Sequence, residues 1–269
     1  MLESKSTTFE DLPVTYWEGG VGDPLLMLHG SGPGASTEGN WRLVLDRLAE
    51  HFHVIAPDLI GFGRSGRKPA PPFFDMPLWQ RQARAMLGIF GEKAVNVIGH
   101  SLSGPIALRT AASDERVRAV MVTGSLGVAF PVNAATERTW TFPATREAIR
   151  VAGETLVYRR ELIDDTYLDG RVRILHDGHY GDYFSSMFAG PKDVFIDAAV
   201  LSDGEITALT CPVLLVHGKN DNPVPWEETA VPLARRIPQA ELILIDRCGH
   251  SPALEYPDRF VAIVQSFFQ

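Results

Sequence analysis

The chain has 269 residues, of which 45% are hydrophobic and 22% are charged, a composition typical of a globular protein with a substantial core. Its formal net charge of −8 disfavours nucleic acids and anionic membrane surfaces as partners, because both attract clusters of basic side chains. No apolar stretch approaches the roughly 18 residues of a membrane span, and residues 1–14 lack the apolar segment of a secretory signal. We therefore expect a cytoplasmic protein.

Predicted strands and helices alternate along most of the chain. Two β-like stretches near residues 7–9 and 14–17 come first, and we expect them to add antiparallel edge strands. Short runs rich in Val, Ile and Leu follow at residues 25–28, 54–56, 95–98, 119–122, 213–216 and 242–245. Helical patterns with one apolar face lie between or after these runs, at residues 41–48, 79–90 and 260–267. Strands that are apolar on both faces are typical of a parallel sheet covered by helices.

The alternation breaks between about residues 130 and 207, where helical patterns carry many aromatic residues but no clear strand. We interpret residues 130–207 as a helical cap inserted into a core formed by residues 1–129 and 208–269. Such a cap would cover a site, exclude water and supply apolar walls. We expect about a third of its aromatic side chains to face a ligand, since most must hold the cap together.

The segment VNVIGHSLSG at residues 95–104 predicts a reactive serine. An apolar strand runs into a Gly-X-Ser-X-small turn and then into a helix, which places Ser101 on a sharp elbow flanked by small residues. Its hydroxyl would lie at the positive end of the helix that begins near Leu102, where negative charge is favoured. The same short pattern also occurs in ordinary turns, so its interpretation depends on the rest of the chain.

Two further side chains follow predicted strands near the end of the chain. Asp221 closes the sequence HGKND after residues 213–216, and His250 closes DRCGH after residues 242–245. Open parallel sheets place their ligand crevices just beyond the carboxyl ends of the strands. Ser, then Asp, then His is the chain order of α/β-hydrolases, whereas other serine hydrolase folds use other orders. The long gap before Asp221 leaves room for the cap.

These residue types supply the parts of a nucleophilic catalyst. A serine hydroxyl is a poor nucleophile near neutral pH, so Ser101 needs the imidazole of His250 as its base. The carboxylate of Asp221 would fix the imidazole tautomer and stabilise the imidazolium. The glycine-rich turn HGSGPG at residues 29–34 follows a buried strand, and we assign the oxyanion-hole N–H groups to Ser31 and Leu102.

Neither a metal nor a cofactor is expected. Cys211 and Cys248 form no CxxC pair, and we interpret them as two buried, reduced thiols. His176 and His179 lie beside acidic residues, but the sequence HDGHYGDY is more typical of a helix end and a turn than of a metal site. The sequence leaves open whether the chain forms a homo-oligomer.

The whole chain resembles the α/β-hydrolase superfamily, and more narrowly the meta-cleavage product hydrolases, which cleave carbon–carbon bonds in aromatic catabolism. The resemblance implies an α/β fold with a mostly parallel eight-stranded sheet, flanking helices and an inserted helical cap. The narrower likeness is carried by five local sequences: LHGSGPGA at residues 28–35, NW at 40–41, DLIGFGRS at 58–65, the cap stretch from 161 to 171, and CGH at 248–250.

This resemblance implies a substrate class and two binding residues. The substrate would be a carboxylated vinylogous 1,5-diketone, which the triad ketonises and then cleaves into an acid and a dienoate. Arg171 matches a cap arginine that contacts the acidic end of the substrate, and Asn40 matches an asparagine near the oxyanion region. A planar guanidinium can hold a carboxylate through two hydrogen bonds. The alternative for Arg171 is a solvated surface residue, with Arg173 as a competitor for the role.

Three positions depart from the subfamily pattern. Many carbon–carbon hydrolases have Asn before the serine, Gly two residues after it and Trp after the histidine, whereas this chain has His100, Ser103 and Ser251. A histidine before the nucleophile is widespread among esterases. These changes leave the nucleophile and its base in place and bear on the substrate class.

Three functions remain open on the sequence alone. A carbon–carbon hydrolase is favoured by a basic cap residue facing a carboxylate, and a carboxylesterase or lactonase acting on a small apolar ester would be favoured by a purely apolar pocket. The third reading is a small-molecule receptor or a cofactor-free dioxygenase, in which the serine matters less. The intact set of Ser101, Asp221 and His250 argues against the third.

Overall fold

The computed structural model describes residues 2–175 and 177–269 and contains an eight-stranded sheet in the order β1-β2-β4-β3-β5-β6-β7-β8. The strands are β1 (Glu3–Phe9), β2 (Leu12–Gly19), β3 (Asp23–Leu28), β4 (Phe52–Pro57), β5 (Val95–His100), β6 (Val117–Thr123), β7 (Val213–Gly218) and β8 (Ala240–Ile245). Strand β2 is antiparallel to β1 and β4, and the other neighbouring pairs are parallel. The expected mostly parallel sheet is confirmed. Of the two N-terminal strands only β1 is at the edge, because β2 lies between β1 and β4.

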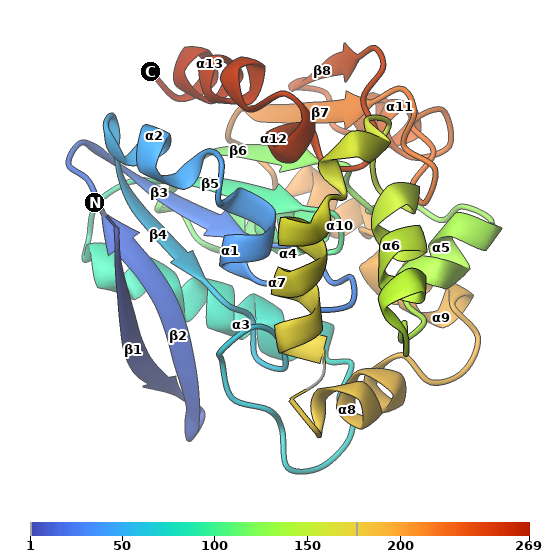
Figure 1. The fold of residues 1–269 in the computed structure, drawn as a ribbon. Helices are drawn as coiled ribbons and strands as arrows, with labels where there is room; N and C mark the ends of the chain where they lie inside the picture. The colour runs from blue at the N-terminus through green and yellow to red at the C-terminus, as the bar shows by residue number, and fades with distance from the viewer. Residues whose placement is uncertain (1, 176) are drawn as a thin grey trace.

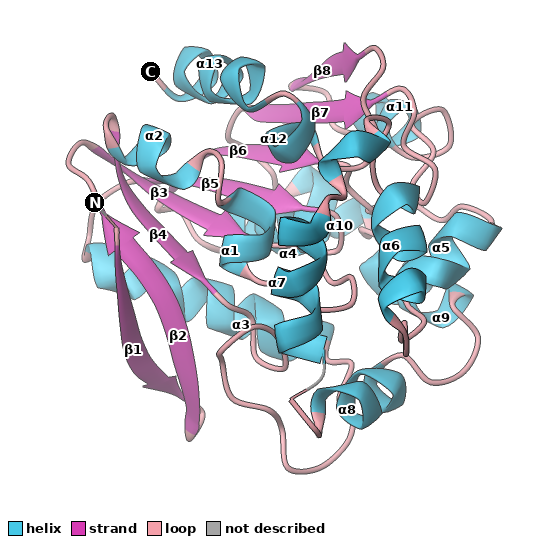
Figure 2. Ribbon diagram, in the orientation of Figure 1, coloured by secondary structure: helices cyan, strands magenta, loops and turns pink. Residues whose placement is uncertain are grey.

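Helices cover both faces of this sheet, and side chains alternate between two cores as the strand pleat requires. In β3, Leu25 and Met27 face one core, whereas Leu26 and Leu28 face the other. The first core lies under α1 (Thr37–Trp41), α2 (Leu45–Ala49), α12 (Pro252–Glu255) and α13 (Pro257–Phe268). The second lies under α3 (Met76–Leu87), the 3-10 helix Gly88–Phe90, α4 (Ser103–Ser113) and α11 (Ala230–Arg236). Figure 2 shows the sheet between these two groups of helices.

The helices between β6 and β7 lie on the side toward which the central strand arrows point (Figure 1). They are α5 (Ala134–Thr139), α6 (Arg146–Thr155), the 3-10 helix Arg160–Leu162, α7 (Asp165–Leu175), α8 (Tyr180–Met187), α9 (Asp193–Ala199) and α10 (Asp203–Thr207). No strand occurs among the described residues of this stretch. The assignment of residues 130–207 as a separate cap domain stays a prediction. We use "cap helices" below for α5 to α10.

Aromatic side chains of the cap helices pack mainly against one another. The rings of Trp140 and Phe188 stack with centroids 5.6 Å apart and planes only 6° apart. Phe195 meets both rings edge-on at 5.8 and 5.2 Å. These contacts hold the ends of α5 and α8 against α9, because offset and edge-to-face aromatic pairs stabilise packing beyond the area they bury. The three rings belong to the same apolar cluster as the core under α3 and α4.

Cysteine burial differs slightly from the expectation. Both thiols are free, Cys248 is buried, and Cys211 is only partly buried. Burial raises the pKa of both thiols, so each stays protonated near neutral pH. In residues 2–175 and 177–269, no helix combines the length and the apolar character that crossing a membrane requires.

Candidate active site

The nucleophile elbow forms where β5 ends and α4 begins. Ser101 adopts a φ of +58°, a left-handed conformation that is uncommon outside glycine, and its N–H donates to the carbonyl of Thr123 at 2.9 Å. A Cβ atom on Gly99 would lie 2.3 Å from the carbonyl oxygen of Ser103. Glycine is therefore required at position 99, because a side chain there would collide with the backbone of Ser103. This agrees with the predicted need for small residues beside Ser101. Such a strained conformation persists only where the surrounding structure holds it.

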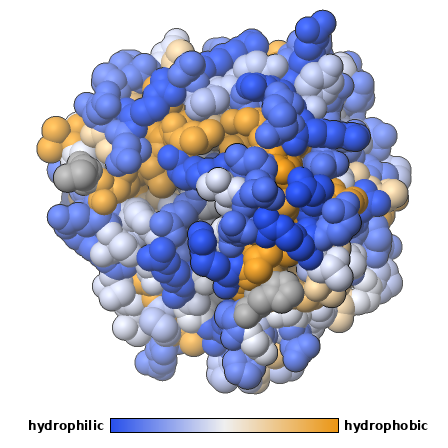
Figure 3. Space-filling model, in the orientation of Figure 1, coloured by the Kyte–Doolittle hydropathy of each residue, from blue (hydrophilic) through white to orange (hydrophobic). Residues whose placement is uncertain are grey.

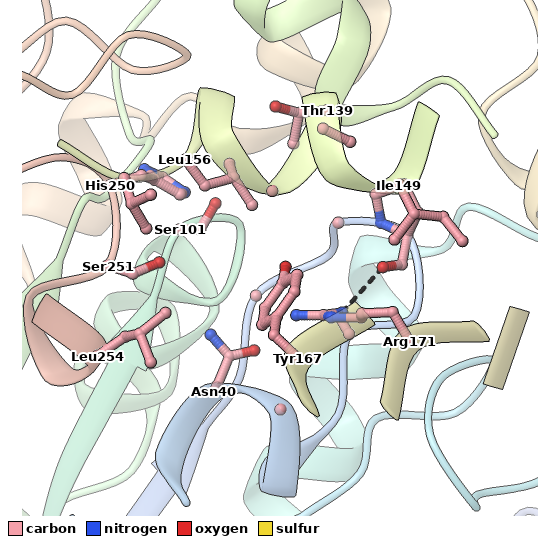
Figure 4. A pocket seen from close by; sticks show the side chains of 18 of the residues that line it. Asn40, Ser101, Thr139, Ile149, Leu156, Tyr167, Arg171, His250, Ser251 and Leu254 are labelled. Carbon is pink, nitrogen blue, oxygen red and sulfur yellow. Dashed lines mark hydrogen bonds between the residues drawn. The ribbon is translucent and has the colours of Figure 1, made fainter. Parts of the chain in front are cut away.

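The two other predicted triad residues meet Ser101 at the carboxyl ends of the strands. Asp221 lies in the turn after β7, and His250 lies after β8. Nδ1 of His250 lies 2.8 Å from Oδ2 of Asp221, and all three residues are buried. Because the carboxylate can only accept, Nδ1 carries the proton and Nε2 is left as the base. Figure 4 shows the ring of His250 pointing toward the hydroxyl of Ser101.

Asp221 has more partners than the sequence analysis assigned to it. Nε2 of His217 lies 2.9 Å from the same Oδ2, and the N–H of Val224 donates to Oδ1 at 2.9 Å. Burial opposes ionisation of this carboxyl, but the charge of His250 and the hydrogen bonds from the two histidines outweigh it and hold the pKa of Asp221 far below its ordinary value. Asp221 is therefore ionised across the whole range in which an imidazole can act as a base.

The glycine-rich turn after β3 packs directly against the elbow. A Cβ atom on Gly30 would lie 3.1 Å from Cβ of Ser101. The hydroxyl of Ser31 accepts a hydrogen bond from the Trp140 indole N–H at 3.0 Å, so a cap residue holds this turn in place. Among the described residues, the backbone N–H groups of Ser31 and Leu102 have no hydrogen-bond partner in the protein. Both donors are thus available to an oxygen atom at the elbow.

A pocket extends from the elbow between the core and the cap helices, and we call it the inner pocket. Ser101 and His250 lie at one end and Arg171 at the other, with Asn40 and Tyr167 between them (Figure 4). Apolar side chains form much of its wall: Ile149, Leu156, Val157, Ile163 and Leu254. Tyr167 is the aromatic residue of the described part of 130–207 that lines the inner pocket, and the share of cap aromatics that face a ligand stays a prediction.

Arg171 is half-buried in the inner pocket and reaches it from α7. Its Nη1 donates to the carbonyl of Pro33 at 2.8 Å, the dashed line in Figure 4. Its guanidinium lies 5.3 Å from the centre of the Tyr167 ring, within the range of a cation–π contact. Arg173, the competitor, is exposed and does not line this pocket. The structure therefore places the predicted arginine where it can meet a ligand.

His100 also lines the inner pocket, as its place beside the elbow suggested. Its Nδ1 lies 3.1 Å from the carbonyl oxygen and 3.0 Å from the hydroxyl oxygen of Thr123. Burial, together with the nearby charge of His250, lowers the pKa of His100 to about 3. The ring therefore stays neutral at working pH and cannot replace His250 as the base.

Two residues that position the site were not predicted from the sequence. The first is His217, which contacts the carboxylate of Asp221. Glu255 was not considered, although it is buried and its carboxylate accepts from the N–H groups of Gly249, Tyr158 and Arg159 at 2.6, 2.8 and 2.9 Å. Its position five residues after His250 was the available signal. The residue type gave no indication that Glu255 is buried, because glutamate is usually exposed.

The sequence predicts no metal site at residues 176–182. His176 lies outside the described residues. Within the part of the chain that the structure describes, no group of three or more histidine, cysteine or acidic residues could hold a metal ion. The absence of a metal site stays a prediction.

Comparison with known proteins places this chain in a family. A model described as "Alpha/beta hydrolase family" matches residues 25–263. A 2-hydroxymuconate semialdehyde hydrolase of Pseudomonas sp. strain CF600 is 33% identical and is matched over 93% of this chain and 88% of its own length. A 2-hydroxy-6-oxo-2,4-heptadienoate hydrolase of Pseudomonas putida F1 is 30% identical over 92% of this chain and 90% of its own.

Solved structures that are similar to this chain include hydrolases of the same kind. A serine-to-alanine mutant of the meta-cleavage product hydrolase from Pseudomonas fluorescens IP01, complexed with acetates, superimposes with a TM-score of 0.93. It is 31% identical, and the match covers 98% of this chain and 97% of that one. The 2-hydroxy-6-oxo-6-phenylhexa-2,4-dienoate hydrolase of Rhodococcus sp. strain RHA1 gives a TM-score of 0.88 at 27% identity, covering 100% and 99% of the two chains.

Proposed function

The chain belongs to the alpha/beta hydrolase family, and from this we propose that it hydrolyses a carbon–carbon bond in a carboxylated vinylogous 1,5-diketone, the product of meta-cleavage of an aromatic ring. Its relatives that are 30% and 33% identical over most of the chain carry the names of such hydrolases. A small molecule is the substrate.

One observation of the structure supports this substrate class most directly. Arg171 lies in an otherwise largely apolar pocket, at the end opposite Ser101 (Figure 4). A half-buried guanidinium stabilises a carboxylate through charge-assisted hydrogen bonds, and a neutral ester would gain nothing from it. The amide of Asn40 lies between the two ends and serves to orient the substrate.

The proposed mechanism assigns one task to each residue. His250 takes the proton of the Ser101 hydroxyl, and Ser101, or a water that it helps to activate, adds to the ketone carbonyl. The N–H groups of Ser31 and Leu102 hold the oxyanion, and ionised Asp221 stabilises the imidazolium. The carbon–carbon bond then breaks. The fragment that leaves takes up the proton held by His250 and departs as the dienoate. If water added, the acyl fragment is released directly as a carboxylic acid. If Ser101 added, the acyl fragment stays as an ester on Ser101 until a water, activated by His250, hydrolyses this ester to the acid and restores the serine hydroxyl.

Ester hydrolysis is the second candidate. It needs the same nucleophile, base and oxyanion donors, and the apolar wall of the inner pocket would accept a small apolar ester. The histidine before the nucleophile, His100, fits this reading as well. The two activities differ in whether the arginine at the far end is used.

Replacement of Ser101 tests the mechanism. We expect Ser101→Ala to lower kcat by roughly a thousandfold or more while ligand binding is kept, because members of a triad act as a unit. The assay is the loss of visible colour of a dienolate substrate, run beside turnover of a p-nitrophenyl ester. Ser113→Ala is the matched control, because Ser113 is an exposed serine at the end of α4, the helix that follows the elbow.

A near-normal rate in Ser101→Ala would exclude a serine nucleophile. Wild-type protein that hydrolyses the ester but leaves the dienolate colour unchanged would exclude carbon–carbon cleavage and leave the second candidate.

A cytoplasmic location belongs to the same proposal. The two free thiols support it, since such a pair is typical of a reducing compartment.

A further inference from the structure

A second depression lies behind Arg171, and we call it the outer cleft. It is hollowed between α1 and α7 and has a volume of about 540 Å³, against about 50 Å³ for the inner pocket. Arg171, Tyr167 and Gly39 line both spaces, so a wall of three residues separates them. Figure 3 shows mainly hydrophilic side chains over α1 and α7 on this face. A molecule bound in the outer cleft is therefore separated from the inner pocket only by the layer that these three residues form.

The outer cleft carries more positive charge than its own carboxylates can neutralise. Glu38 is paired with Arg64 at 2.8 Å, and Asp177 is paired with Arg67. The oxygens of the third acid, Asp58, accept backbone N–H groups at 2.7 and 2.8 Å. Besides Arg64, the arginines that line the cleft are Arg42, Arg171 and Arg173, and none of these three has an ion-pair partner among the described residues. This excess stands out in a chain whose net charge is −8.

Arg42 and Arg171 approach the same aromatic ring. The Arg42 guanidinium lies 6.0 Å and the Arg171 guanidinium 5.3 Å from the centre of Tyr167. Desolvation and the charge of Arg171 lower the pKa of Arg42, while Tyr167 and Asp164 act in the opposite direction. Two like charges held close together repel each other, and an anion bound between them would remove that repulsion.

We propose that the outer cleft is a docking site for the carboxylate of the substrate, with Arg42 as the cation that binds it before it reaches Arg171. This inference rests on the proposed function, since it assumes an anionic substrate. Charges at the rim of a site act mainly on the rate of association and on its salt dependence. Arg42 therefore governs capture of the substrate, and the triad governs the chemical step.

Steady-state kinetics with the dienolate substrate test the proposal. We expect Arg42→Gln to lower kcat/KM about three- to tenfold at low ionic strength, to leave kcat unchanged and to flatten the salt dependence of kcat/KM. Arg42→Lys should keep both the rate and the salt dependence, because it keeps the charge. Arg81→Gln is the matched control, since this exposed arginine is paired with Glu10 and lines neither the outer cleft nor the inner pocket.

Turnover of a neutral p-nitrophenyl ester distinguishes a loss of anion capture from general damage to the active site. Arg42→Gln should hydrolyse this ester at the wild-type rate, because the ester carries no carboxylate. Unchanged kcat/KM for the dienolate in Arg42→Gln, or an equal loss with the neutral ester, would overturn the proposal.

A second test does not depend on carbon–carbon cleavage. Sorbate, a simple dienoate, carries the carboxylate that the outer cleft would bind, and its inhibition of ester turnover can be measured in each protein. If the wild-type protein does not cleave the dienolate, the proposed function fails by itself. The docking site then still requires the inhibition constant of sorbate to rise about three- to tenfold in Arg42→Gln and to stay unchanged in Arg81→Gln. Equal inhibition constants in all three proteins would overturn it.

Discussion

Asp221 receives two imidazole rings on one carboxylate oxygen, and each ring has a different task. His250 contacts Oδ2 through Nδ1 and so presents Nε2 to Ser101 (Figure 4). His217 contacts the same oxygen through Nε2, which also lies 2.8 Å from the carbonyl of Val224. Since both neighbours of that nitrogen are acceptors, His217 carries its proton there and acts as a donor. The carboxylate is thereby fixed in the orientation that His250 needs.

Replacement of Arg171 tests whether this single side chain binds the carboxylate of the substrate. We expect Arg171→Gln to lower kcat/KM for a carboxylated diketone about 10- to 100-fold, since a hydrogen bond to a charged group contributes roughly 1.5–3 kcal/mol. Turnover of a neutral p-nitrophenyl ester measures any damage to the oxyanion turn, because Arg171 also holds the carbonyl of Pro33. Equal losses on both substrates would mean that Arg171 supports the turn and does not bind substrate.

At the scale of elements, the loop that carries His250 is fastened to the cap helices. The N–H of His250 donates to the carbonyl of Leu156, at the end of α6, at 2.8 Å. On the other side, Glu255 of α12 accepts from Gly249 in the histidine loop and from Tyr158 and Arg159 after α6. One buried carboxylate thus joins the segment 249–255 to residues 158–159, which lie 97 and 96 positions before Glu255 in the sequence. The position of His250 therefore depends on residues 156–159.

Glu255→Gln tests this connection. A glutamine amide has one acceptor oxygen where three N–H groups converge, so at least one donor is left without a good partner, at a cost of about 1–3 kcal/mol. We expect a lower melting temperature and a lower kcat for both the diketone and the neutral ester. Glu161→Gln removes an exposed carboxylate paired with Arg159 and is the control. Unchanged kcat and unchanged unfolding in Glu255→Gln would contradict the role of this carboxylate.

At the scale of the whole molecule, buried histidines tie stability to pH. His29 is buried. Its Nδ1 lies 2.6 Å from the carbonyl oxygen of Gly30, and its Nε2 accepts the N–H of Leu59 at 2.9 Å. A second proton on this ring would break the bond to Leu59, and burial lowers the pKa of His29 to about 4. The unfolded chain binds that proton near pH 6.5, so folding loses stability as the pH falls from 6.5 toward 4.

Other groups titrate in or near the same window. The pKa of His100, lowered to about 3, acts in the same direction as that of His29. Burial raises the pKa of Asp58 to about 6, so the folded state binds this proton first and gains stability as the pH falls from 6 to 4. The lowered pKa of Asp221 costs stability only below about pH 4. The effect of a single histidine is therefore best measured as a difference between two proteins.

The comparison of wild type with His29→Asn isolates this histidine. We expect the variant to be less stable at pH 7, and the difference in unfolding free energy to shrink by up to about 2 kcal/mol at pH 5, because only the wild type loses the His29 contribution. Urea unfolding at pH 7, 6 and 5 measures it. A difference that is the same at all three pH values would show that His29 does not titrate between the folded and unfolded states as described.

Local sequence patterns determined the strands, the elbow and the order of the triad. Apolar runs of four residues predicted β3 and β7, because strands buried on both faces leave little choice of residue type. The elbow around Ser101 was readable because a φ of +58° and the close approach of Ser103 to Gly99 admit few residues. Chain order, together with positions just after two predicted strands, assigned Asp221 and His250. In the structure these two side chains are in contact, and His250 lines the same pocket as Ser101.

Only the tertiary structure decided which polar residues share a space. Glu255 and His217 are ordinary residues in the sequence, and their roles arise because loops from different strands meet at one edge of the sheet. The same holds for the excess charge of the outer cleft, since the neutralisation of Arg64 by Glu38 depends on a contact across 26 positions. Hydrogen bonds and ion pairs act over a few ångströms in space. Sequence periodicity encodes which face of an element is buried, but not which distant side chain it meets there.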